Sequence, residues 1–220
     1  MREITTGVYQ LSTAPMQLIN LYLVDDTLID AGIRSDKKKI LKALNGHTIK
    51  QHALTHVHPD HQGASHEVCE ALDIPLWCSE IEITAMETGN MDSQIPSNLI
   101  TTVQNQFWTG AAHPVEKGLK EGDRVGSFTV IETPGHSPGH ISFWRERDRV
   151  LIAGDVAHNI NFLTLQTELG EPPDMFTMDS ELNRQSLRKL ADLNPAIVLF
   201  GHGKPLLDGA KFVDFATQVS

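Results

Sequence analysis

The chain places three histidines and one aspartate within six consecutive positions: His56, His58, Asp60 and His61, with Pro59 between them. A buried imidazole or carboxylate without a partner costs free energy, so the fold must give these side chains a common partner or leave them in solvent. In an extended segment, residues i and i+2 point the same way, so His56 and His58 can converge on one ion. Asp60 and His61 would lie in the first turn of a following helix and face a second ion. The alternative is a helix N-cap by Asp60 beside incidental surface histidines, but this residue set favours metal ligation.

With 40% apolar and 21% charged residues, the 220-residue chain can bury the core of one domain, which we take to span residues 1–220. No apolar run approaches the roughly 18 residues that cross a bilayer, and the first residues do not read as a signal peptide. We therefore expect a soluble, cytoplasmic protein that binds no membrane. The net charge of −10 disfavours a nucleic-acid partner. Cys69 and Cys78 lack metal-type spacing and are interpreted as core thiols.

The rest of the chain reads as short strands and helices separated by Gly and Pro. In the first half we predict a hairpin, a helix, a strand, a helix and a strand, at 18–32, 36–44, 48–56, 62–72 and 74–78. In the second half we predict strands within 128–136 and 141–155, separated by turns at Pro134-Gly135, Pro138-Gly139 and the charged "RERD". A helix at 179–193 and a strand at 196–203 follow. This alternation favours layered α/β packing. Residues 81–117 mix polar residues, prolines and aromatics, and we interpret them as an excursion and a candidate cover for the active site.

Three more candidate ligands directly follow predicted strands: His136, Asp155 and His202. Each stands next to a glycine, which lets the backbone approach closely without a Cβ clash. Loops beyond the carboxyl ends of strands are where α/β proteins build their sites. Any one of the three alone would be an ordinary turn residue, but together with the first cluster they indicate a metal centre.

These motifs resemble the metallo-β-lactamase superfamily, through His56-x-His58-x-Asp60-His61, "TPGHSPGH" with His136, "AGD" with Asp155 and "GHG" with His202. The opening hairpin "NLYLVDDTLIDAG" is also similar to the start of that family. The resemblance implies an αββα four-layer sandwich with a metal centre at one edge of its two sheets. It also implies that His56, His58 and His136 bind one metal, that Asp60, His61 and His202 bind a second, and that Asp155 bridges them.

Such a centre predicts a dinuclear metal-dependent hydrolase. Two divalent cations lower the pKa of a bridging water towards neutrality and so supply a metal-bound hydroxide as nucleophile. By family geometry Asp60 would lie beside this water and act as the catalytic proton shuttle. Zinc suits imidazole with carboxylate ligands, and Mn or Fe can occupy the same set.

Within the superfamily the short motif set resembles the glyoxalase II-like branch, whose members hydrolyse thioesters. Few residues follow His202, whereas glyoxalase II places its glutathione-recognising residues in a helical C-terminal extension. We therefore expect a small-molecule substrate with an ester, thioester or lactone bond. The alternatives are a mononuclear iron persulfide dioxygenase, a phosphodiesterase or nuclease, and a non-catalytic metal-binding module. Nothing in the sequence indicates the oligomeric state.

Other residues receive weaker interpretations. His140 is expected to hydrogen-bond within its turn and support the centre rather than bind metal. His158 and Asn159 either line the pocket or belong to an ordinary loop without a functional role. Phe107 and Trp108 are expected either to form an apolar wall of the pocket or to belong to a small satellite core. A second apolar wall is expected from a set of loop residues near the metal ligands: Phe162, Leu163, Leu165, Met175 and Phe176. Their apolar character favours an uncharged or partly apolar substrate. No site is assigned to four histidines: His47, His52, His66 and His113.

Overall fold

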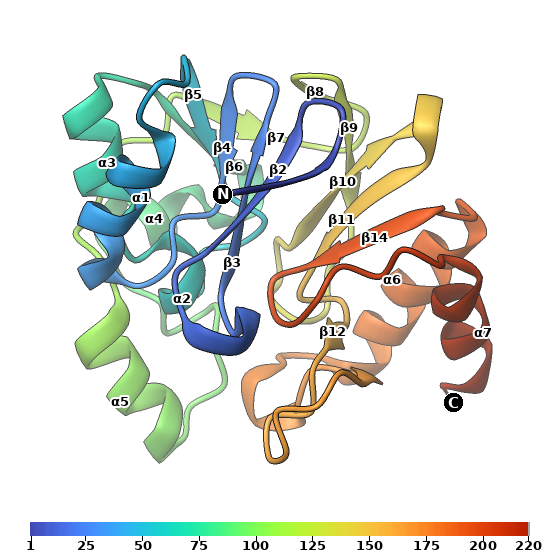
Figure 1. Ribbon diagram of the computed structural model, residues 1–220. Coiled ribbons are helices and arrows are strands. Elements are labelled where there is room, and N and C mark those ends of the chain that lie inside the picture. The colour runs from blue at the N-terminus through green and yellow to red at the C-terminus, as the bar shows by residue number, and fades with distance from the viewer. Residues whose placement is uncertain (220) are drawn as a thin grey trace.

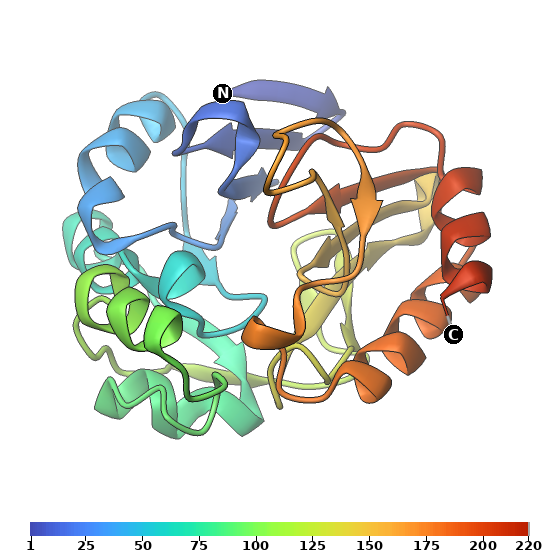
Figure 2. The ribbon, with the colours of Figure 1, turned by 90° about the horizontal axis from the view of Figure 1, so that it is seen from below.

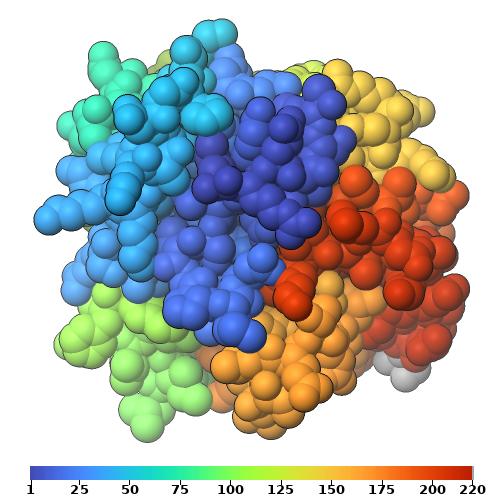
Figure 3. Space-filling view, in the orientation of Figure 1, coloured from blue at the N-terminus to red at the C-terminus, as the bar shows by residue number. Residues whose placement is uncertain are grey.

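The computed structural model describes residues 1–219, so Ser220 of the expected domain lies outside the described residues. Two β-sheets face one another, and helices cover the outer face of each (Figures 1 and 2). Seen from below in Figure 2, the layers run from helices through two sheets to helices again. The N-terminal and C-terminal surfaces meet directly on the face drawn in Figure 3, where blue atoms lie beside orange and red ones.

The larger sheet has seven strands within the described part of the chain, and their spatial order is also their order in the sequence. These strands are β1 (Arg2–Thr5), β2 (Val8–Ser12), β3 (Asn20–Val24), β4 (Thr27–Ile29), β5 (Gln51–Ala53), β6 (Leu76–Ser79) and β7 (Lys117–Leu119). The strands β1 to β4 pair antiparallel, and β4 to β7 pair parallel. The hairpin predicted at 18–32 is confirmed as β3–β4, which turns at Asp25 with φ of 53°.

The second sheet has five strands among residues 1–219, in the order β14, β11, β10, β9, β8. Their bounds are β8 (Arg124–Val125), β9 (Phe128–Glu132), β10 (Ile141–Arg145), β11 (Val150–Gly154) and β14 (Ile197–Phe200). The pair β11–β14 is parallel and the others are antiparallel. The segment 141–155 is therefore a hairpin, β10–β11, with a 3-10 turn η4 (Glu146–Asp148) between its strands. A small ribbon, β12 (His158–Asn159) with β13 (Leu169–Gly170), follows it.

The main core lies between the two sheets and draws buried side chains from both. Val8, Tyr22 and Ile29 come from the first sheet, and Phe143 and Leu199 from the second. The Tyr22 hydroxyl donates to the Phe200 carbonyl at 2.7 Å and so joins β3 to β14. A continuous core over this range of the chain supports our proposal of one domain.

Helices bury their apolar faces on the outside of each sheet. The first sheet carries α1 (Lys37–Leu44), α3 (Ser65–Leu72) and α4 (Ile83–Thr88), with α2 (Pro59–Gln62) and α5 (Leu99–Trp108) towards one end (Figure 1). The second sheet carries α6 (Ser180–Asp192) and α7 (Ala210–Gln218). The remaining turns are 3-10 helices: η1 (Pro15–Gln17), η2 (Arg34–Asp36), η3 (Glu80–Glu82) and η5 (Asp174–Phe176). No helix between residues 1 and 219 combines the length and apolar composition that a membrane crossing requires.

The structure changes some predicted elements. The helix predicted at 62–72 is present as α3 but begins only at Ser65, because α2 and α3 are separated at Gly63, whose N–H donates to the Gly32 carbonyl at 2.8 Å. A Cβ at Gly63 would lie 2.5 Å from the Arg34 backbone nitrogen, so this close approach requires glycine. The excursion 81–117 contains two helices, α4 and α5, instead of irregular chain. The strands predicted at 48–56 and 128–136 are shorter, because their last residues form the loops of the candidate site.

Cys69 on α3 and Cys78 on β6 are buried and unpaired in disulfides, as predicted for core thiols. Burial raises the pKa of the Cys69 thiol to about 12 and also raises that of Cys78. Both side chains are therefore neutral packing residues near pH 7.

Candidate metal centre

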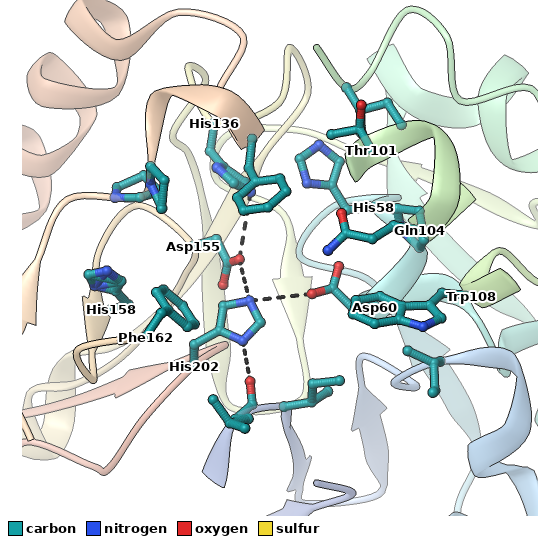
Figure 4. A pocket seen from close by; sticks show the side chains of 18 of the residues that line it. His58, Asp60, Thr101, Gln104, Trp108, His136, Asp155, His158, Phe162 and His202 are labelled. Carbon is teal, nitrogen blue, oxygen red and sulfur yellow. Dashed lines mark hydrogen bonds and ion pairs between the residues drawn. The ribbon is translucent and has the colours of Figure 1, made fainter. Parts of the chain in front are cut away.

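All seven predicted ligands lie at one end of the two sheets, in loops that follow strands or in the short helix α2. His56 and His58 come after β5, and Asp60 and His61 lie in α2. Each remaining ligand follows a strand of the second sheet: His136 after β9, Asp155 after β11 and His202 after β14. Figure 4 shows His58, Asp60, His136, Asp155 and His202 approaching one another from different elements.

The side chains form two overlapping half-sites. One ligand atom each from His56, His58 and His136 lies within 4.8 Å of the others, and Asp60, His61 and His202 meet the same limit. Asp155 belongs with His56 and His61 in a third such group, so it stands between the half-sites. Its Oδ2 lies 2.9 Å from His202 Nε2, 3.4 Å from His61 Nε2 and 3.6 Å from His136 Nε2.

A hydrogen bond outside the centre fixes one ring nitrogen of each histidine, and the other nitrogen faces inward. The Nδ1 atoms of four rings bond outward: His56 to Thr55 Oγ1, His61 to Asp30 Oδ2, His136 to Thr177 Oγ1 and His202 to the Leu18 carbonyl. His58 is reversed, because its Nε2 donates to the Gln94 carbonyl at 2.8 Å. Such outer contacts select the tautomer and orient a metal-ligating ring.

Four buried polar atoms of the cluster have no hydrogen-bond partner among the described residues: His56 Nε2, His61 Nε2, His136 Nε2 and Asp155 Oδ1. Buried polar atoms are almost always paired, so a group of orphans that face each other indicates a ligand. Three imidazole nitrogens and one carboxylate oxygen are ligand atoms that commonly bind a divalent transition metal. The residues present therefore fit the pair of metal ions that the resemblance implies.

The electrostatics of the cluster also favour cations. Burial holds the pKa of His56 and of His136 well below the usual range, so both rings are neutral and able to donate a lone pair. Burial also acts to lower the pKa of His202, but the Asp155 carboxylate outweighs it and raises that pKa to about 9. A metal ion held by His202 and Asp155 would displace this proton.

Glycine makes room for the ligands at two strand ends. A Cβ at Gly201 would lie 2.0 Å from Asp155 Oδ1 and 2.7 Å from His61 Cε1. A Cβ at Gly154, where φ is 58°, would lie 2.6 Å from His140 Nε2. These contacts confirm the close backbone approach that the glycines beside Asp155 and His202 predict.

Two buried carboxylates that support the ligand loops were missed in the sequence. The Asp30 carboxylate, directly after β4, accepts hydrogen bonds from the backbone N–H and the hydroxyl of Thr55 and from His61 Nδ1 at 2.9 Å. Its position directly after a strand, like that of Asp155, is the signal that could have found it. Glu82 in η3 accepts from Val57 N–H at 2.8 Å and from Gly139 N–H at 3.1 Å.

Glu82 therefore connects the loop of His56 and His58 with the loop of His136. Its second contact in that loop is a hydrogen bond from the Ser137 hydroxyl. Burial raises the pKa of Glu82 to about 7, although these three donors act in the opposite direction. No short-range sequence pattern marks it, since its partners lie 25 to 57 positions away in the chain.

His140 supports the centre as predicted. Its Nε2 accepts from the Asp155 backbone N–H at 3.0 Å, and its Nδ1 is bonded to Thr133 Oγ1 at 2.8 Å. Burial lowers the pKa of His140 to about 3, so the ring stays neutral. With both nitrogens engaged, His140 positions Asp155 and has no free nitrogen to offer a metal ion.

A pocket of about 480 Å³ opens onto the half-sites. Its walls are mainly apolar, with Trp108 of α5 on one side and Phe162 on the other (Figure 4). Phe176 also lines the pocket, and the lining within the described chain includes no Lys or Arg. Some predicted wall residues are not in this lining: Phe107, Leu163, Leu165 and Met175. His158 lines the pocket, whereas Asn159 instead donates to the Lys204 carbonyl at 2.9 Å.

Residues 17–202 match the family model described as "Metallo-beta-lactamase superfamily". A Bacillus subtilis (strain 168) protein named "Probable metallo-hydrolase YflN" is 32% identical over 249 residues, which covers 99% of this chain and 91% of that protein. A "Hydroxyacylglutathione hydrolase" of Bdellovibrio bacteriovorus is 29% identical over 151 residues, covering 67% of this chain and 46% of that protein.

Solved structures agree with the family match. TTHA1623, solved in a di-iron-bound form, has 28% sequence identity and a TM-score of 0.68, covering 90% of this chain and 94% of that one. The BLEG-1 B3 metallo-β-lactamase has 26% identity and a TM-score of 0.69, covering 90% and 93%. The αββα fold expected from the sequence resemblance is thus confirmed.

Proposed function

The chain belongs to the metallo-β-lactamase superfamily, and on that basis we propose that it is a dinuclear metallohydrolase acting on an ester, thioester or lactone bond. The observation that carries the proposal is the convergence of four unpartnered buried atoms, on His56, His61, His136 and Asp155. When bound, a pair of divalent cations lowers the pKa of a water molecule and polarises a carbonyl oxygen.

The chain supplies two sets of donors for these ions. His56, His58 and His136 form the proposed first set and Asp60, His61 and His202 the second, and we place Asp155 between the two. Zinc is the proposed metal because it suits imidazole with carboxylate, and iron and manganese accept the same donors. The di-iron form of TTHA1623 supports iron as the second choice.

Asp60 is the proposed catalytic proton carrier. Its carboxylate lines the pocket, and its Oδ2 lies 3.5 Å from His202 Nε2. This position lets Asp60 accept a proton beside the half-sites and deliver it to a departing alkoxide or thiolate in the pocket. An Asp60→Asn variant that retains its metal is expected to lose kcat, which steady-state kinetics on the preferred substrate would measure.

The pocket supports a substrate with an apolar acyl part. Ile33, Ile95, Trp108, Phe162 and Phe176 provide an apolar surface, and the lining includes no Lys or Arg from the described residues to pair with a carboxylate. A glutathione leaving group carries carboxylates, so we propose an uncharged leaving group in its place. Thr101, Gln104 and His158 remain as neutral polar contacts.

The proposed partner is a small molecule, with neither nucleic acid nor membrane involved, and the proposed location is the cytoplasm. The net charge of −10 supports the absence of a nucleic-acid partner. The unoxidised pair Cys69 and Cys78 supports a reducing compartment. We also propose that the segment 81–117 covers the site, since its residues Ile95, Thr101, Gln104 and Trp108 line the pocket.

The experiment combines metal analysis of the native protein with a substrate panel. The panel compares an apolar thioester, ester and lactone with a glutathione thioester and a phosphodiester. At least two metal ions per chain and preferred hydrolysis of an uncharged acyl substrate are expected. One iron per chain with oxygen uptake on a persulfide would instead identify a dioxygenase, and a preference for the phosphodiester would identify a phosphodiesterase.

A further inference from the structure

A second cluster of metal-binding side chains lies away from the pocket described above. His66 and Glu70 are four residues apart on α3, so they share one face of that helix. His113 comes from the segment between α5 and β7. One ligand atom from each of the three lies within 4.8 Å of the others, and none of the three residues lines the main pocket.

We propose that His66, Glu70 and His113 form a separate site for a zinc-type divalent transition metal. The two Nδ1 atoms of His66 and His113 are 3.1 Å apart, with the rings at 70° to each other. Two imidazole nitrogens bound tetrahedrally to one zinc ion are roughly 3.3 Å apart, given Zn–N distances of about 2.0–2.1 Å. The rings therefore already stand at the separation that a shared ion requires.

The surroundings supply the negative charge that a cation needs. Glu70, Asp73 and Glu116 line a cavity of about 360 Å³ together with His113, and its lining within residues 1–219 contains no Lys or Arg. His113 is 9% exposed and is held by its backbone N–H, which donates to the Met86 carbonyl at 3.1 Å. Glu70 is exposed, so solvent reaches the cluster and water can complete the coordination.

The ligand chemistry selects the metal class. Two imidazoles with one carboxylate favour Zn²⁺, Co²⁺, Ni²⁺ or Cu²⁺, whereas Mg²⁺ and Ca²⁺ prefer sites made of oxygen alone. A bound ion would connect α3 to the segment that precedes β7. Because that link contains none of the seven ligands of the main centre, we expect it to stabilise the fold and leave hydrolysis unchanged.

The competing explanation is a direct N–H···N hydrogen bond between two neutral rings, and zinc counting separates the two. The protein is equilibrated with chelator-buffered zinc and its metal content is measured for the wild type, His66→Asn and Glu70→Gln. The control is His47→Asn, which changes an exposed histidine that lies beside Tyr9. We expect wild type and control to bind about one zinc ion more than His66→Asn at the same free zinc.

Glu70→Gln is expected to bind this ion about 10-fold more weakly, because it loses the charged donor. In a crystal soaked with zinc, an anomalous peak is expected beside His66 and His113. Equal zinc content in wild type and His66→Asn, or a loss that His47→Asn shares, would overturn the proposal. If the wild type bound one more magnesium ion than His66→Asn when magnesium replaced zinc, the proposed preference for a zinc-type metal would also be contradicted.

Discussion

At the scale of single residues, His58 differs from the other four histidines of the centre in the nitrogen that it turns inward. Its Nε2 is bonded to the Gln94 carbonyl, so Nδ1 faces the half-site. Gln94 belongs to the segment 81–117, which also lines the pocket. The backbone of this segment therefore orients one candidate ligand directly, and its conformation and the metal centre are coupled.

Asp30→Asn is expected to weaken metal binding. Asp30 accepts the Nδ1–H of His61, and an amide in its place binds that ring more weakly and can favour the wrong tautomer. The expected loss of metal affinity is about 10-fold to 100-fold, measured by competition with a chelator. The matched control is Asp36→Asn, because Asp36 is also buried but bonds to Ile33 and Lys39 outside the centre. Equal losses in both variants would contradict the role of Asp30.

Glu82→Gln is expected to destabilise the fold. The buried Glu82 carboxylate accepts hydrogen bonds from Val57, Ser137 and Gly139 through its two oxygens. A glutamine amide has only one oxygen, so its NH2 group faces at least one of these three hydrogen-bond donors and leaves it unpaired. Leaving a buried donor unpaired costs about 1–3 kcal/mol, so the free energy of unfolding should fall by that amount in denaturant titrations. The exposed neighbour Glu80 gives the control, Glu80→Gln, which should change stability little. If the two variants lose the same stability, Glu82 does not connect the loops.

At the scale of elements, helix α5 was missed in the sequence and forms one wall of the pocket. Its sequence contains β-branched Thr101, Thr102 and Val103, which lower helix propensity. The helix begins nevertheless because Asn98 accepts from the N–H groups of Ile100 and Thr101. Such capping depends on one side chain and gives little periodic signal, whereas α6, with Leu187 and Leu190 buried on one face, was predicted correctly.

Trp108→Ala is expected to raise KM for an apolar acyl substrate about 10-fold with little change in kcat. The indole lines the pocket and loses apolar contact with the substrate in ground and transition states alike. Phe107→Ala is the control, since Phe107 is 57% exposed and outside the lining. Steady-state kinetics on the preferred ester or thioester measure both variants. A fall in kcat alone would instead place Trp108 in the reaction step.

The strand β5 carries a pH-dependent contribution to stability through His52. The ring donates from Nδ1 to the Leu28 carbonyl at 3.0 Å and accepts at Nε2 from Ser65 Oγ at 2.8 Å, which joins β5 to β4 and α3. Burial lowers the pKa of His52 from 6.5 to about 4. On acidification the unfolded chain therefore binds a proton at His52 at higher pH than the folded protein does. The contribution of the neutral His52 ring to the free energy of unfolding is complete above pH 6.5 and is lost as the pH falls towards 4.

The stability advantage of wild type over His52→Gln is expected to shrink on acidification. Between about pH 7.5 and about pH 5 the difference in unfolding free energy should fall by about 2 kcal/mol, since one pKa unit corresponds to about 1.36 kcal/mol. Denaturant unfolding at the two pH values measures it. His47→Gln changes an exposed histidine and should show no such pH dependence. A constant difference for His52→Gln would show that the ring is not held neutral by the fold.

At the scale of the whole molecule, the candidate centre joins the two halves of the chain. His56, His58, Asp60 and His61 follow β5 of the first sheet, and the remaining ligands follow β9, β11 and β14 of the second. The positions of all seven were predictable because each follows a strand and the strands have clear apolar patterns. Their meeting at one edge is a consequence of how the two sheets face each other.

The features that the sequence did not predict depend on contacts between distant residues. Glu82 meets Gly139 across 57 positions, and His66 meets His113 across 47, and neither pair has a local pattern. The break between α2 and α3 likewise depends on Gly63 pairing with Gly32. Local periodicity determines elements and strand ends, whereas these contacts depend on tertiary packing.

A crystal structure of the protein grown with zinc would show whether the seven side chains hold two metal ions. Two anomalous peaks are expected at the main centre, one in contact with His56, His58 and His136 and the other with Asp60, His61 and His202. They come in addition to the peak expected beside His66 and His113. Asp155 should contact both ions of the main centre. A single peak at that centre, or two peaks there with Asp155 in contact with neither, would show that the seven side chains do not hold a pair of ions.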